Sequence, residues 1–476
     1  MTVHFRRKNL VKDKLLMFVI FPLFFLVAIL STVFICEHIS LIPDLGNKEY
    51  LFIVIAITSI YFLNLQWVRR KSKYIIILIA NILAIEILLQ IAALAGIIPG
   101  MRIMWRTPFG RSYHSAEGFS NGFMNRQGWH YANFDADSTA HRIALIGDSF
   151  IEAHEIPTKK HLGVRLESTF NSKNPDDPFY RVSALGITGA GPAQYLEILK
   201  FGYRHLKPET AIVFLFLGND FSNSLHEAES NMRKPPAEYI YYTLDDSGEL
   251  ALLPGSEKAR EDLFDAMESN YSLSPGQLVK TGFGYILLPQ IVGNVFQKIR
   301  FMLKKNKHLQ ESADEVEQDF NRIGLAFDAF IFRQPVDSTG EKAYAIVEKL
   351  MLKMQRFSEQ KGIDLIFVTI PHFPEVFFRN QTGANWSMVY NNYDFLSPEN
   401  RLSEFATSQQ LTFWKTGAWL QESGMTVEDV QSLYFLDGSG HLTPKGHALF
   451  AKFIGERLQF HFRRKQAFHI AETPEQ

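Results

Sequence analysis

A serine that follows a short apolar run is the first residue of this chain whose position suggests chemistry. Residues 143–146 read Ile-Ala-Leu-Ile and are followed by Gly147-Asp148-Ser149. Such a run predicts a buried parallel strand, and open α/β sheets place their reactive groups just beyond the carboxyl ends of strands. Ser149 is therefore a candidate nucleophile. The alternative interpretation is an ordinary strand-to-helix turn with a capping serine.

A nucleophilic serine needs donors for a developing oxyanion, and two later segments offer them. The glycine-rich turn 186–191 follows the second predicted strand, where a backbone N–H faces outward without a Cβ in the way. Asn219 follows the third predicted strand and carries a side-chain amide. All these positions lie beyond the carboxyl ends of neighbouring strands, so they are expected to converge. A purely conformational role is the alternative for the glycines, and a turn role is the alternative for Asn219.

Candidates for the base and its orienting group lie near the end of the chain. His441 stands just before the last predicted helix, and Asp437 precedes it by four residues in Asp437-Gly438-Ser439-Gly440-His441. An imidazole suits proton transfer at neutral pH, and a carboxylate can hold it in the required orientation. Asp148 is interpreted as a turn-stabilising carboxylate. His154, His161 and His447 are interpreted as surface or packing residues.

The order of these blocks resembles that of the SGNH (GDSL-type) hydrolases, over about residues 120–460. The resemblance implies that Ser149 is the nucleophile and also lends its backbone N–H to the oxyanion hole. It assigns a second N–H to Gly189, the side-chain donor to Asn219, the base to His441 and its orienter to Asp437. Gly186 and Gly191 are the alternatives to Gly189 as the donor. The family spacing is Asp-x-x-His, whereas here three residues separate the pair, and the glycines at 438 and 440 would absorb the extra residue.

Alternating strand and helix patterns must position these residues. The predicted strands are 143–146, 180–185, 210–217, 363–370 and 411–415, and the predicted helices are 161–170, 192–206, 341–360 and one that opens at Thr443-Pro444. This alternation predicts an α/β fold with a doubly wound parallel sheet and helices on both faces. The resemblance implies a flavodoxin-like three-layer α/β/α SGNH hydrolase domain.

The first hundred residues have the composition of a membrane anchor. Three apolar runs, 15–36, 51–68 and 74–98, are each long enough to cross a bilayer, and only the third contains a carboxylate, Glu86. Residues 1–14 and 69–73 each carry a net charge of +4, and the 37–49 loop carries −2. The positive-inside rule then predicts an inner-membrane protein whose N-terminus is cytoplasmic and whose later residues are exported, into the periplasm in a Gram-negative bacterium.

The expected organisation is a three-helix anchor (1–98), an irregular lead-in (99–140), a hydrolase domain (141–226 and 341–460), an insertion (227–340) and a flexible tail (461–476). The 476 residues include one cysteine and carry a net charge of −1. Neither a disulfide framework nor a nucleic-acid partner is expected. The sequence has no metal-ligand spacing, and no cofactor is implied.

These features together predict a membrane-anchored serine esterase that acts on acyl esters of envelope glycans or lipids, or on small esters. One alternative is an O-acetyl or other acyltransferase in polysaccharide modification or export, with a membrane-protein partner. The other is a non-catalytic glycan-binding or assembly protein with the same fold.

Overall fold

The computed structural model describes residues 73–94, 101–103, 111–114, 118, 120–132, 134, 140–172, 179–232, 239–271, 286–288, 329–372, 389–390, 393–435 and 440–472. The predicted membrane-spanning runs 15–36 and 51–68 lie outside these ranges. So does the candidate orienter Asp437.

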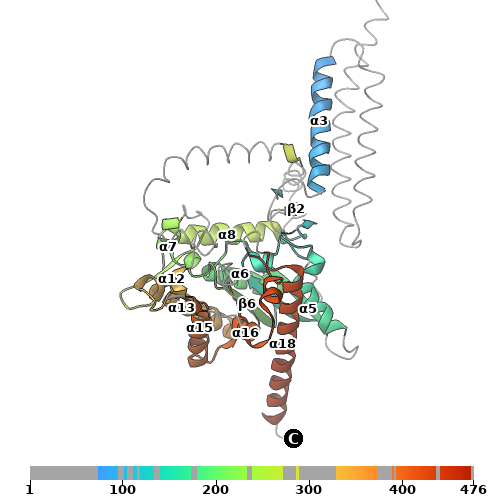
Figure 1. Ribbon diagram of the computed structural model, residues 1–476. Helices are drawn as coiled ribbons and strands as arrows, with labels where there is room; N and C mark the ends of the chain where they lie inside the picture. Colours follow the sequence, from blue (N-terminus) through green and yellow to red (C-terminus); the bar gives the residue numbers. More distant parts are fainter. Residues whose placement is uncertain are drawn as a thin grey trace, which may run out of the picture.

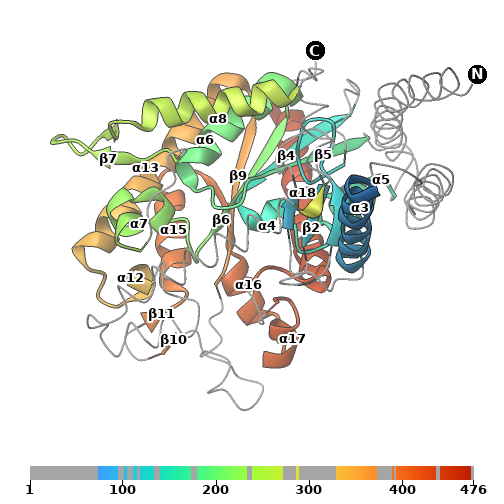
Figure 2. The ribbon, with the colours of Figure 1, turned by 90° about the horizontal axis from the view of Figure 1, so that it is seen from above.

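A five-stranded parallel sheet forms the centre of the molecule (Figure 2). Its strands are β4 (His141–Gly147), β5 (Tyr180–Gly186), β6 (Thr210–Phe216), β9 (Asp364–Ile370) and β12 (Thr412–Trp414). They lie in the order β12-β9-β6-β4-β5, and every neighbouring pair is parallel. Counted along the chain this order is 2-1-3-4-5, the flavodoxin-like doubly wound arrangement. The predicted α/β class and parallel sheet are confirmed.

Helices cover both faces of the sheet. α5 (Leu162–Asn171) packs with α18 (Pro444–Glu472) on one side, and α6 (Pro192–Leu206) packs with α13 (Ser338–Lys361) on the other (Figure 2). Local capping sets the ends of α13: the Asp337 carboxylate accepts a hydrogen bond from the Gly340 N–H, and Gly362 ends the helix in the left-handed region. β6 is buried along its whole length, as a continuous apolar run predicts for a strand covered on both faces.

Shorter elements complete the domain. These are α4 (Ser149–Glu152), η1 (Thr158–Lys160), η2 (Ser222–Ser224), α7 (His226–Met232), α12 (Ala329–Phe332), β10 (Val389–Tyr390), β11 (Tyr393–Asp394), α15 (Ser397–Ser408), α16 (Thr416–Glu422) and α17 (Val427–Gln431). α4 is the one that carries the candidate nucleophile, and it follows β4 after a single residue, Asp148.

The lead-in segment is more regular than the sequence analysis predicted. β1 (Met101–Ile103), β2 (Arg111–His114) and β3 (Ser120–Phe123) form an antiparallel sheet in that order. Strands of three or four residues are too short to show a period-two pattern of apolar residues, and this explains why the sequence read as irregular.

The described part of the predicted insertion packs onto the domain. β7 (Tyr242–Leu244) and β8 (Leu250–Leu252) form a hairpin, and α8 (Ser256–Tyr271) lies against α6. The hairpin turn forms where Asp-Asp-Ser-Gly predicts it, with the Asp245 carboxylate accepting hydrogen bonds from the N–H groups of Ser247 and Glu249. Tyr242, Leu263 and Met267 are buried members of the main core.

The prediction of a flexible tail is wrong for residues 461–472, because they continue α18 (Figure 1). Contacts with the sheet edge give this extension its stability. His461 Nε2 lies 2.7 Å from Asp364 Oδ2, and Lys465 Nζ lies 2.6 Å from Asp364 Oδ1. The Phe462 ring stacks on Tyr180 with its centroid at 6.1 Å. A side-chain pattern within the helix does not reveal such partners, because Asp364 and Tyr180 belong to distant strands.

The third apolar run forms α3 (Lys73–Leu94). Among the described residues, none of the helices combines the length and the apolar character that crossing a membrane requires. The Glu86 carboxylate on α3 accepts hydrogen bonds from the backbone N–H groups of Leu287 (2.7 Å) and Leu288 (2.8 Å). The one carboxylate of this run is therefore paired with backbone of the predicted insertion.

Candidate active site

The structure brings Ser149 and His441 together from positions 292 residues apart. His441 Nε2 lies 2.8 Å from Ser149 Oγ. Ser149 begins α4 directly beyond the carboxyl end of β4, and its residue is 7 % exposed. The His441 backbone carbonyl accepts a hydrogen bond from the Phe435 N–H, and its ring lies 5.1 Å from the Phe150 ring. The serine and the imidazole are thus held in the geometry of a nucleophile and a base.

Asp148 is buried between β4 and α4. Its Oδ1 accepts a hydrogen bond from the Phe150 N–H at 3.0 Å and caps α4, in agreement with the predicted turn role. Burial raises the pKa of Asp148 to about 6, although the hydrogen bond from Phe150 and the nearby His441 both act to lower it. Asp148 therefore has a structural role here, because it holds the turn that presents the candidate nucleophile Ser149.

The glycine-rich turn lies beside the serine. Gly186 pairs with Gly147 in the sheet, and Ile187 donates its N–H to the Gly147 carbonyl at 3.0 Å. Gly189 has φ +73°, a conformation that favours glycine, and a Cβ there would meet the Tyr239 hydroxyl. Within the described part of the chain, the backbone N–H groups of Ser149 and Gly189 make no hydrogen bond. Both are therefore available to an oxyanion.

Gly191, one of the two alternatives to Gly189 as a donor, differs from it in this respect. The Gly191 N–H donates to Gln194 Oε1 at 3.2 Å, at the start of α6. Its N–H is engaged in the local fold, so Gly189 is the better candidate of the two.

Asn219 sits in a braced turn after β6. The Asp220 carboxylate accepts hydrogen bonds from the Phe216 N–H (2.9 Å) and from the Tyr195 hydroxyl (2.8 Å). The same hydroxyl lies 3.3 Å from the Ala190 carbonyl oxygen, so Tyr195 ties this turn to the glycine-rich turn. Asn219 Oδ1 is buried without a partner, and its side-chain amide makes no hydrogen bond to the described residues. The amide is therefore able to donate to a bound ligand.

A carboxylate that the sequence analysis missed contacts His441, the candidate base. Glu155 Oε1 lies 3.2 Å from His441 Nδ1, and Glu155 is 4 % exposed. Asp437, to which the resemblance assigned this contact, lies outside the described residues. The sequence did contain a signal: three ionisable residues, Glu152, His154 and Glu155, follow the serine within six positions, which is unusual for a turn that is buried.

Glu152 links the nucleophile helix to the glycine-rich turn. Its Oε2 accepts a hydrogen bond from the Thr188 N–H, and its Oε1 lies 3.0 Å from His154 Nε2. His154 is almost fully buried and lies against the His130 ring at 4.8 Å. This buried group stabilises the two segments that carry Ser149 and Gly189.

His161 and His447 serve the packing of α5, as the sequence analysis interpreted them. His161 Nδ1 accepts a hydrogen bond from the Gly163 N–H at 3.0 Å, and His447 Nδ1 accepts one from the Leu162 N–H at 3.2 Å. Burial lowers the pKa of His161 to about 4 and that of His447 well below its usual value. Neutral rings are required for both contacts, since a protonated Nδ1 cannot accept.

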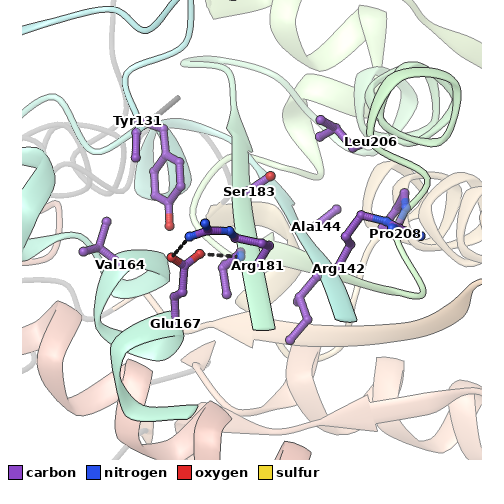
Figure 3. Close-up of a pocket in the computed structure, with 12 residues that line it drawn as sticks. Tyr131, Arg142, Ala144, Val164, Glu167, Arg181, Ser183, Leu206 and Pro208 are labelled. Carbon is purple, nitrogen blue, oxygen red and sulfur yellow. Dashed lines mark hydrogen bonds and ion pairs between the residues drawn. The ribbon is translucent and has the colours of Figure 1, made fainter. Parts of the chain in front are cut away.

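A cavity of about 120 Å³ lies elsewhere in the domain (Figure 3). It is lined by Arg142 and Ala144 of β4 and by Arg181 and Ser183 of β5, near the amino ends of these strands. Glu167 beside it accepts a hydrogen bond from the Val182 N–H at 2.7 Å. Ser149 stands at the opposite end of β4, so this cavity does not belong to the candidate site.

Of the known proteins compared with this chain, only solved structures match it. No family model matches the chain, and no curated protein does. Among the solved structures that match, a GDSL-like lipase from Bacteroides thetaiotaomicron is 10 % identical with a TM-score of 0.28, covering 67 % of this chain and 89 % of its own. An acetyl xylan esterase is 10 % identical with a TM-score of 0.31, covering 66 % and 98 %.

A third match is a structure assigned to the lipolytic G-D-S-L family, from Desulfitobacterium hafniense. It is 11 % identical with a TM-score of 0.29 and covers 66 % of this chain and 98 % of its own. The matching structures include GDSL-type ester hydrolases. These identities and TM-scores are too low to support a function, and the side-chain geometry of the site is the basis for one.

Proposed function

We propose that this chain is a serine enzyme of the SGNH type that cleaves acyl esters. The observation that carries the proposal is the 2.8 Å contact between His441 Nε2 and Ser149 Oγ, at the carboxyl edge of a parallel sheet. Two backbone N–H groups and one side-chain amide near this edge have no partner among the described residues, and this supports an oxyanion hole made by Ser149, Gly189 and Asn219.

The chemistry proceeds in two acyl-transfer steps. His441 Nε2 takes the proton of Ser149 as Oγ forms a bond to the ester carbonyl carbon, and the carbonyl π electrons move onto its oxygen. The three donors stabilise this oxyanion, and each is worth roughly 10²–10³ in rate. Collapse of the intermediate expels the alcohol, which takes its proton from His441. Water, activated by His441, then releases the acyl group from Ser149.

The substrate class is an acyl ester of an envelope glycan or lipid. The support is the location that the sequence predicts: the three apolar runs 15–36, 51–68 and 74–98, with basic residues at 1–14 and 69–73, favour a chain that crosses the membrane three times and exports its later residues. A sugar hydroxyl in place of water in the second step would make the same site an acyltransferase.

Covalent labelling tests the catalytic proposal. The full-length protein in detergent is expected to react with a fluorophosphonate probe, and Ser149→Ala is expected to lose all labelling because the attacking oxygen is removed. Ser408→Ala, an exposed serine at the end of α15, serves as the matched control and is expected to label normally.

The outcomes separate the three candidate functions. Labelling at Ser149 together with hydrolysis of p-nitrophenyl acetate supports an esterase. Labelling without hydrolysis favours acyl transfer to a glycan hydroxyl. Absence of labelling at Ser149 would contradict both and favour a glycan-binding protein without turnover.

Reporter fusions test the proposed membrane topology. Alkaline phosphatase fused after residue 72 is expected to be inactive, and a fusion after residue 476 is expected to be active, because this reporter folds only after export. A fluorescent protein at the same two points should show the opposite pattern. Equal phosphatase activity at both points would contradict the proposed orientation.

A further inference from the structure

The turn after α4 brings the Glu155 carboxylate beside His441. Ala153 ends α4 in the left-handed region, with φ 48°, and Glu155 follows it two residues later. Glu155 Oε1 lies 3.2 Å from His441 Nδ1, while Nε2 of the same ring lies 2.8 Å from Ser149 Oγ. Each nitrogen of the imidazole therefore has a partner of the type that catalysis requires.

This arrangement selects one tautomer of the imidazole. An ionised carboxylate can only accept a hydrogen bond, so Glu155 beside Nδ1 favours the tautomer that carries the proton on Nδ1. Nε2 is then unprotonated and can accept the Ser149 hydroxyl proton. When that proton has moved, the ring is an imidazolium, and the negative Glu155 stabilises its charge.

The burial of Glu155 points in the same direction. A buried carboxylate is unfavourable unless a hydrogen bond or a positive charge compensates it. Glu155 Oε2 is buried and makes no hydrogen bond within the described part of the chain, so the contact with His441 is what compensates the group there. A glutamate needed only for packing would be better replaced by an apolar or amide side chain.

The lead-in segment closes over this turn. Gly118 has φ +66°, and a Cβ on it would lie 2.6 Å from the Phe435 ring and 2.7 Å from the Glu155 carbonyl oxygen. Phe435 in turn donates its N–H to the His441 carbonyl. Gly118 therefore allows close packing around the residues that hold both Glu155 and His441.

From this geometry we propose that Glu155 is the positioning residue of the base, orienting His441 for proton transfer with Ser149. The inference rests on the proposed function and differs from the assignment of this role to Asp437 by resemblance. Among the described residues, Asp148, at the start of α4, and His447, on α18, also interact electrostatically with this pair.

Kinetics of Glu155→Gln in the full-length protein test the inference. We expect the second-order rate of Ser149 labelling and the kcat for p-nitrophenyl acetate to fall by about 10³–10⁴-fold, with KM changed less than twofold. The acid limb of the pH–rate profile is expected to move to lower pH, because the variant no longer stabilises the imidazolium. Glu155→Asp keeps the charge and should retain the wild-type acid limb at a reduced rate, which covers the case in which the glutamine variant folds poorly.

Two further variants complete the test. Glu197→Gln, equally buried at 4 % exposure on α6, is the matched control and should keep wild-type kinetics and pH profile. Asp437→Asn is expected to cost less than Glu155→Gln. A loss below tenfold in Glu155→Gln, or a larger loss in Asp437→Asn, would overturn the inference. If the wild-type protein itself does not label, the proposed function fails instead, so the two failures are distinguishable.

Discussion

Exchange of His441 for glutamine is expected to lower the rate of Ser149-dependent ester cleavage by about 10⁶-fold, the loss seen when the base of a serine triad is removed. Glutamine keeps approximately the same volume beside Phe150 but cannot take the Ser149 proton. The hydroxyl would then remain un-ionised, because nothing else is seen within hydrogen-bond distance of Oγ among the described residues. The measurement is the pseudo-first-order rate of fluorophosphonate labelling, together with hydrolysis of p-nitrophenyl acetate.

A matched control separates the base from the general effect of losing a histidine. His226→Gln removes an exposed imidazole on α7 and is expected to leave both rates unchanged. Circular dichroism should show both variants folded. A His441→Gln variant that labels within tenfold of the wild-type rate would mean that another group activates Ser149.

The second large effect concerns stability. Gly186→Ala is expected to lower the free energy of unfolding by at least about 3 kcal/mol, at the upper end of the usual range for overpacking. A Cβ on Gly186 would overlap the Glu152 nitrogen and the Ile151 carbonyl carbon, both backbone atoms of α4. Backbone atoms of a buried helix cannot rotate away as a side chain can, so β5 and α4 must separate.

Urea unfolding followed by tryptophan fluorescence measures this loss. Gly455→Ala on α18 is the matched control, because its Cβ would meet only Leu166 Cδ1 at 3.4 Å, an ordinary contact. Its helical position makes alanine neutral to stabilising by up to about 1 kcal/mol. An unfolding midpoint equal to that of the wild type would contradict this prediction, because it would show that α4 leaves room for a Cβ on Gly186.

These two predictions concern the same small region. α4 carries Ser149 at its first residue, and its last residue, Glu152, binds the Thr188 N–H of the glycine-rich turn. The nucleophile and a candidate oxyanion donor are thus joined through four residues and one buried carboxylate. A disturbance at Gly186 is therefore expected to reduce labelling of Ser149 as well as stability.

Local pattern in the sequence determined the elements of the domain. The helix predicted over 192–206 has those bounds in the structure, because a proline at its first turn and an apolar stripe are properties of neighbouring residues. The strands predicted at 143–146 and 210–217 form for the same reason, as continuous apolar runs. The short strands of the lead-in carry too little pattern, and they were missed.

The sequence by itself also nominated Ser149, the glycine-rich turn 186–191, Asn219 and His441, since position after a strand or before a helix is readable along the chain. Within that turn, the family resemblance singled out Gly189. Only the tertiary structure showed which carboxylate contacts His441 Nδ1. Glu155 reaches it because a left-handed Ala153 turns the chain and Gly118 leaves room for close packing. A contact between two side chains depends on their distance in space, and spacing along the chain does not record that distance.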